Sequence, residues 1–120
     1  MSKICTDIEQ SKKLIELGID ANTADMYYMW TGSDWMPCLM EDGDYNNLGY
    51  IPAWSLSALL ELMPERDGRS PELNRPINTN KWWVLYHSTA FLSLLRTKEC
   101  NTPLDAAFEM ICLLLKDKLI

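Results

Sequence analysis

The chain is short, acidic and moderately apolar, and these properties exclude several classes of protein. It has 120 residues, 48% of them hydrophobic, and 11 basic against 17 acidic side chains for a net charge of −6. This length predicts one domain over residues 1–120, and the apolar content is too high for a disordered chain. The excess of acid repels phosphate, so we expect no nucleic-acid binding.

The N-terminus and the cysteines favour a soluble cytoplasmic protein with reduced thiols. The first residues lack the apolar run of a signal peptide. The longest apolar stretch, residues 110–115, is far too short to span a membrane. Cysteines stand at positions 5, 38, 100 and 112, with no closely spaced pair. We therefore expect no membrane association, no disulfide, no metal and no bound cofactor.

The first element is a predicted helix over about residues 7–17. Thr6 and Glu9 have the spacing of a capping box, in which each side chain satisfies a backbone amide of the other residue. Gly18 is expected to end the helix, because glycine enters the left-handed conformation at little cost.

Two aromatic runs, residues 26–30 and 34–40, follow as a predicted hairpin. The sequence Thr31-Gly32-Ser33 between them suits a tight turn. Pro37 cannot donate a ladder hydrogen bond, so the second run is expected to be an edge strand.

The middle of the chain is predicted to contain one short helix between two irregular segments. Residues 41–50 form a polar loop, after which Ser55 or Ser57 caps a Leu-rich helix that stops at Pro64. Residues 64–80, rich in Pro and Asn, are predicted to be a long irregular connection.

The C-terminal part begins with the strongest strand signal in the chain, residues 81–87. Residues 90–96 permit either a helix or a strand, and their position favours a hairpin partner. Thr102 and Pro103 then open the last helix. Its apolar residues Leu104, Phe108, Ile111 and Leu115 mark it as the principal core helix.

The order of elements, α-ββ-α-ββ-α, predicts an α+β fold. We expect two layers, with about three helices packed on one antiparallel sheet of about four strands built from two hairpins.

Two segments resemble a known family. They are Pro-Ala-Trp-Ser-Leu-Ser-Ala-Leu-Leu-Glu-Leu-Met-Pro at 52–64 and Asn-Thr-Pro-Leu-Asp-Ala-Ala-Phe-Glu-Met at 101–110. The chain is similar, over most of residues 6–120, to short uncharacterised proteins encoded by prophages and mobile elements of gut anaerobic bacteria. In that family a serine-capped, Leu-rich helix precedes a Trp/Tyr-rich hairpin, and a helix beginning Thr-Pro-x-Asp-Ala closes the chain. The resemblance implies no activity, cofactor or catalytic residue.

Candidate chemistry centres on His87, the only histidine, and on the four cysteines. A small enzyme or metal-binding protein could use them. However, His87 ends an apolar strand with no motif around it, and the cysteines lack the paired spacing of structural zinc ligands. We therefore predict no catalytic, cofactor-binding or metal-binding residue, and we keep the enzyme or metal protein as the alternative function.

The tryptophans carry the preferred functional hypothesis. Trp30 and Trp35 flank the first turn, and Trp82 is adjacent to Trp83. Neighbouring strand residues point to opposite faces, so Trp82 and Trp83 cannot share one core layer. A sheet that is apolar on both faces needs helices, a loop or a partner to cover it. We therefore expect a non-enzymatic interaction or accessory protein that binds a protein partner or a second copy through these four residues, with Trp82 or Trp83 near the centre.

Overall fold

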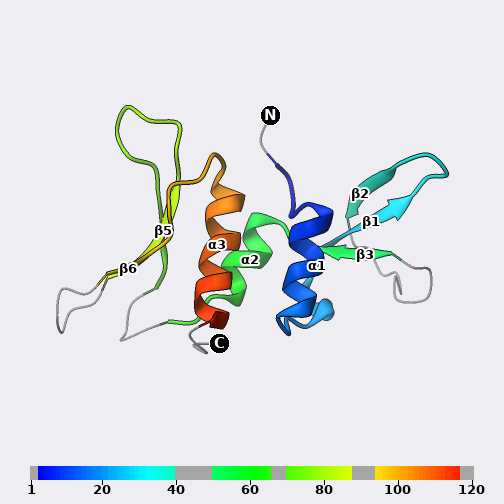
Figure 1. The fold of residues 1–120 in the computed structure, drawn as a ribbon, viewed down its shortest axis with the longest axis horizontal. Coiled ribbons are helices and arrows are strands. Elements are labelled where there is room, and N and C mark those ends of the chain that lie inside the picture. The colour runs from blue at the N-terminus through cyan, green and yellow to red at the C-terminus, as the bar shows by residue number, and fades with distance from the viewer. Residues whose placement is uncertain (1–2, 40–49, 66–69, 88–93, 117–120) are drawn as a thin grey trace.

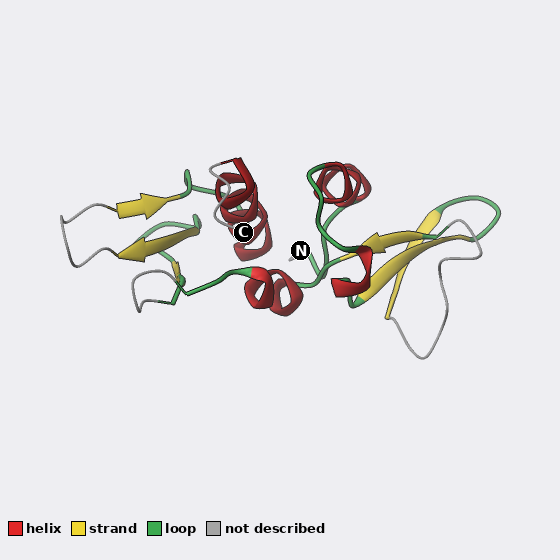
Figure 2. Ribbon diagram, turned by 90° about the horizontal axis from the view of Figure 1, so that it is seen from below, coloured by secondary structure: helices red, strands yellow, loops and turns green. Residues whose placement is uncertain are grey.

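Three helices separate two small antiparallel sheets, which lie at opposite ends of an elongated molecule (Figure 1). The computed structural model describes residues 3–39, 50–65, 70–87 and 94–116, and its extents are 52 × 32 × 22 Å. A view turned by 90° shows the same order, with the helices between the sheets (Figure 2). The α+β class is therefore confirmed.

The first sheet has the strand order β2-β1-β3. Strand β1 (Met26–Trp30) pairs with β2 (Trp35–Leu39) through the predicted hairpin, and with β3 (Ile51–Ala53) on its other side. The turn closes with a 2.8 Å hydrogen bond from the Thr31 amide to the Asp34 carbonyl. Gly32 takes a φ of 101° there, which its missing side chain allows.

The second sheet has the strand order β4-β5-β6. Strand β5 (Trp83–His87) pairs with both β4 (Glu72–Asn74) and β6 (Leu94–Arg96). Residues 94–96 therefore form a strand paired with β5, as the hairpin interpretation of residues 90–96 predicts. Residues 90–93 lie outside the described residues. Trp82 precedes β5 and forms an isolated bridge with Cys100.

The predicted single sheet of about four strands is wrong, because each hairpin recruits its own third strand. Strand β3 follows the predicted polar loop, most of which lies outside the described residues. Strand β4 lies inside the segment 64–80, which was predicted to be irregular. Each of these strands has three residues, too few to show a period of two. Two separate sheets result, and the helices lie between them instead of covering one face.

Helix α1 spans Ile8–Glu16, close to the prediction, but its cap is one residue later than expected. Asp7 accepts a 2.8 Å hydrogen bond from the Gln10 amide, and Gln10 Oε1 accepts from the Asp7 amide. The predicted cap Thr6 is instead fully buried, where its hydroxyl accepts from the Trp54 amide at 3.1 Å. Gly18 has a φ of 103° after the helix, as predicted.

Helices α2 (Leu56–Leu62) and α3 (Pro103–Lys116) begin at predicted caps. The Ser55 hydroxyl accepts from the Ala58 amide, and the Thr102 hydroxyl accepts from the Asp105 amide. None of the helices in the described residues is long and apolar enough to cross a membrane.

The main core joins α1, α2, α3 and the inner face of the second sheet. Helix α3 is its centre, since it packs against both α2 and β5. Its side chains Leu104, Phe108 and Ile111 are buried as predicted. Trp54, between β3 and α2, is fully buried and extends this core toward the first sheet.

Candidate interaction surface

The strands of the first sheet carry no charged residue. Their thirteen residues read Met-Tyr-Tyr-Met-Trp, Trp-Met-Pro-Cys-Leu and Ile-Pro-Ala. Side chains alternate between the two faces of a sheet, and directly paired residues share a face. Both faces are therefore apolar or aromatic, whereas a sheet with one wet face normally alternates with polar residues.

Four large apolar side chains of this sheet remain exposed. By the alternation above, Trp30, Trp35 and Leu39 share one face, which we call the apolar surface, whereas Met36 lies on the other face. The exposed fractions are 52% for Trp30, 38% for Trp35, 46% for Met36 and 70% for Leu39. Trp30 and Trp35 are paired across the hairpin, with ring centroids 5.4 Å apart in an edge-to-face arrangement. These predicted site residues are therefore brought together at one end of the molecule.

The part of the sheet nearest the helices is covered by the N-terminal segment. Met26 and Ala53 form a small second core with Cys5, and Tyr28 packs against it. The Tyr28 hydroxyl donates to the Thr6 carbonyl at 2.9 Å. Burial raises the pKa of Tyr28, and the adjacent Cys5 thiol adds to the shift. These contacts fix the base of the sheet and leave its far end projecting (Figure 1).

The opposite face of the sheet is aromatic and sulfur-rich. Tyr27 stacks on Tyr50 with ring centroids 4.8 Å apart. Met29 pairs directly with Met36, and Tyr27 pairs with Cys38. All five side chains are at least partly exposed. Tyr50 was missed as part of this site, because it was included in the predicted polar loop of residues 41–50 and no strand was predicted beside it.

Trp82 and Trp83 lie in the second sheet, at the other end of the molecule, so the four predicted tryptophans do not form one surface. As predicted, the two point to opposite faces. Trp82 packs against the main core, whereas the guanidinium of Arg96 lies 4.3 Å from the Trp83 ring centroid. Within the described part of the chain, the Trp83 indole N–H is buried without a hydrogen-bond partner.

The residues of the alternative function are scattered. Cys5 lies beside the first sheet, Cys100 forms the bridge with Trp82, and Cys112 lies on α3. Burial raises the pKa of all three thiols, so they stay protonated and weakly nucleophilic at neutral pH. Among the residues that the structure describes, no three His, Cys, Asp or Glu side chains are grouped to hold a metal ion.

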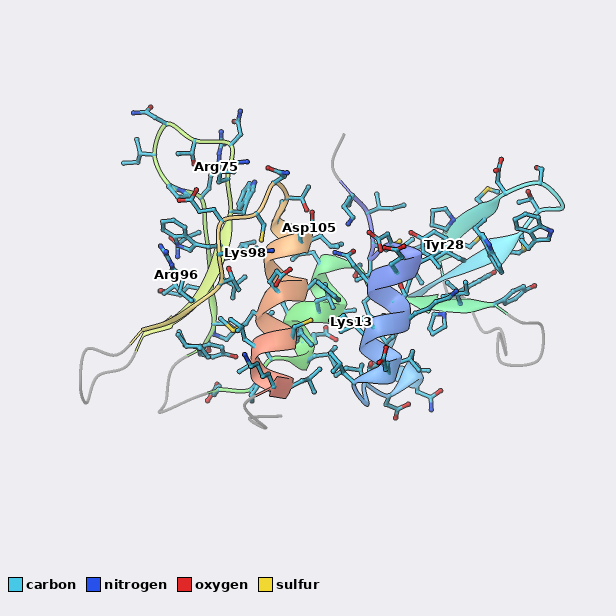
Figure 3. All side chains as sticks on the ribbon, in the orientation of Figure 1. Lys13, Tyr28, Arg75, Arg96, Lys98 and Asp105 are labelled. Atoms are coloured by element: carbon cyan, nitrogen blue, oxygen red, sulfur yellow. The ribbon has the colours of Figure 1, made fainter. Side chains whose placement is uncertain are left out.

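A polar cleft of about 440 Å³ opens between the N-terminal ends of α1 and α3 and the segment 98–101. Lys3 Nζ lies 2.7 Å from Asp105 Oδ1 and 2.9 Å from Gln10 Oε1, and Gln10 Nε2 donates to the same carboxylate oxygen. Burial alone would raise the pKa of Asp105, but hydrogen bonds from Lys3, Gln10 and Thr102 hold it below its usual value. Asp105 faces α1 in Figure 3. The polar groups at the centre of the cleft therefore satisfy one another and join two helices.

No family model matches this chain, and no curated protein or solved structure matches it either.

Proposed function

We propose that the protein is a non-enzymatic interaction factor that binds another protein chain through the apolar surface of the first sheet. The observation that carries this proposal is the exposure of Trp30, Trp35 and Leu39 on one face of a projecting sheet whose strands carry no charge. Exposed apolar clusters are uncommon on monomers, and they mark interaction sites when they occur.

The residue types suit a binding site. Tryptophan is enriched at the energetic centres of interfaces, where its removal often costs at least about 2 kcal/mol. The sequence resemblance at residues 52–64 and 101–110 supports an accessory role in a prophage or mobile element, and the unpaired cysteines suit the cytoplasm.

The proposed site is centred on other tryptophans than those that the sequence analysis put near its centre. Trp82 packs against the core and Trp83 lies beneath Arg96. Trp30 and Trp35 have the free ring surface that a partner needs. We therefore place the first hairpin at the centre.

Affinity capture from the lysate of a bacterium that encodes the protein tests this proposal. The baits are the wild type, the double variant Trp30→Ser/Trp35→Ser, and Ile77→Ser as a matched control. Ile77 is 88% exposed and lies between β4 and β5 of the second sheet, at the other end of the molecule. We expect one or more proteins to be retained by the wild type and the control but lost from the double variant.

Sedimentation of the same three proteins at micromolar concentration tests self-association in parallel. Equal capture by all three baits, together with identical sedimentation, would refute the proposed surface. Circular dichroism must show that the double variant is folded, since exposed residues are expected to cost little stability.

A further inference from the structure

Among the described strands, β2 and β3 form the two edges of the first sheet, and the outer edge of β2 is interrupted by a proline. In an antiparallel pair, residues alternate between pointing their N–H and C=O groups at the partner strand and away from it. The hydrogen bond between Thr31 and Asp34 sets this alternation, and the register carries it along the hairpin. The backbone N–H and C=O groups of Met36 and Cys38 therefore point toward β1, and the backbone of Pro37 faces outward. The central position of this edge has no N–H to donate.

The other edge strand, β3, also has a proline whose backbone faces outward. Alternate residues of β1 form their backbone hydrogen bonds with β2. The residues between them, Met26 and Tyr28, therefore hydrogen-bond to β3, where they pair with Ala53 and Ile51. Pro52 lies between these two, opposite Tyr27, and faces the open edge. Both edges of the first sheet thus lack the central donor that an added strand would need, and prolines at such positions prevent edge-to-edge pairing. A partner must approach a face of the sheet.

The charges around the sheet are all negative along the sequence. No Lys or Arg occurs from residue 14 to residue 65, a stretch that contains the whole first sheet and nine Asp or Glu residues. Asp25 and Asp34 directly precede β1 and β2, and both are exposed. Of the four labelled basic residues, Arg75, Arg96 and Lys98 lie toward the second sheet, and Lys13 lies on α1 between the two sheets (Figure 3). A second copy that docked its first sheet on this one would bring like charges together, which opposes association.

We propose that the apolar surface binds a basic amphipathic helix of another protein, an inference that rests on the proposed function. A sheet face offers no main-chain hydrogen bonds, so the bound segment must satisfy its own, as a helix does. The indole rings of Trp30 and Trp35 and the side chain of Leu39 fit the apolar stripe of such a helix. Its Lys or Arg residues lie along the rim and face the acidic groups that flank the strands.

A titration with designed peptides tests this inference. The probe is a peptide of about 18 residues, long enough to be helical, with Leu on one face and Lys on the other and without Trp. Two matched peptides carry Glu or Gln at every Lys position.

Binding to wild type is followed by calorimetry, and gain of helix is followed by circular dichroism. We expect the Lys peptide to bind as a helix and to bind more weakly when salt rises from about 0.05 M to about 0.5 M. The Glu peptide is expected not to bind.

Two charge reversals locate the site. Asp34→Lys is expected to weaken binding of the Lys peptide about five- to tenfold, on the scale of two exposed charge contacts. Glu99→Lys changes the net charge equally near the polar cleft and leaves binding unchanged. Equal weakening by both variants would show a general charge effect and overturn the inference. So would failure of all three peptides to bind the wild type.

The outcomes also separate this inference from the proposed function. If the Gln peptide binds as tightly as the Lys peptide, and Trp30→Ser removes both, the apolar surface is a binding site without a preference for basic partners. The proposed function then stands, and the basic partner is refuted. Loss of a captured protein from the Trp30→Ser/Trp35→Ser bait likewise supports the proposed function, whatever the peptides do.

Discussion

Replacing Trp54 with Phe is expected to destabilise the protein by about 2–3 kcal/mol. The Trp54 ring is fully buried, and its indole N–H donates to the Thr23 hydroxyl at 2.9 Å. Loss of the pyrrole ring removes roughly 40–50 Å² of burial, or about 1 kcal/mol. The vacated space of roughly 35 Å³ costs about 0.8 kcal/mol more, and loss of the hydrogen bond costs about 1 kcal/mol. Against a total stability of about 5–15 kcal/mol, the variant should fold and unfold at lower denaturant.

Urea unfolding followed by far-ultraviolet circular dichroism measures this loss without interference from the other four tryptophans. The matched control is Trp30→Phe, at a ring that is 52% exposed and contacts Trp35. Its expected cost is below about 0.5 kcal/mol, the usual limit for surface changes. If Trp30→Phe costs as much as Trp54→Phe, Trp30 is an ordinary core residue, and the reasoning for an exposed apolar surface is refuted. A loss below about 1 kcal/mol for Trp54→Phe would show that α2 and the first sheet do not meet around this ring.

Three further changes test the core, the polar cleft and the sheet edge. Phe108→Ala should cost about 3–5 kcal/mol in chemical denaturation; a loss below about 1 kcal/mol would contradict the packing of α3. Because the pKa of Asp105 is lowered in the folded state, its ionised carboxylate stabilises the fold above about pH 4. This stabilisation is lost as the pH falls through the pKa of the folded state. Urea unfolding between about pH 2 and pH 7 should therefore show a shallower loss for Asp105→Asn than for wild type, and equal slopes would exclude the ion pair with Lys3. Pro37→Thr restores an outward N–H and should promote self-association in sedimentation; Cys38→Thr, whose N–H faces β1, should not, and equal behaviour would refute the edge argument.

The local elements were predictable because their signals are carried by neighbouring residues. Caps at Ser55 and Thr102, the left-handed Gly18 and the turn at Gly32 each act within a few positions of the chain. The edge position of β2 followed from Pro37 alone. The displaced cap of α1 shows the limit of such patterns. The structure uses the box of Asp7 and Gln10, one residue later than predicted, and buries Thr6 beside Trp54.

The arrangement of the sheets was not predictable, because it depends on pairings between distant and very short segments. Strands β3 and β4 contribute only three residues each, and Pro52 in β3 argues against a strand on local grounds. Without them, the two hairpins were expected to join. The candidate site was affected in the same way. The opposite orientations of Trp82 and Trp83 followed from strand geometry, but their separation from Trp30 and Trp35 required the tertiary structure.

The contact between Lys3 and Asp105 has a consequence for the order of folding. The two residues are separated by 102 positions, so their hydrogen bond closes a ring containing most of the chain. Bringing the ends of such a ring together from an unfolded chain costs about 4 kcal/mol of conformational entropy, more than one partly exposed ion pair returns. The N-terminal segment should therefore dock only after the helices have assembled around α3, because their packing has then already brought Asp105 within reach. The same segment carries Cys5, which packs with Met26 and contacts Tyr28 at the base of the first sheet, so that sheet should acquire its final orientation in the last step of folding.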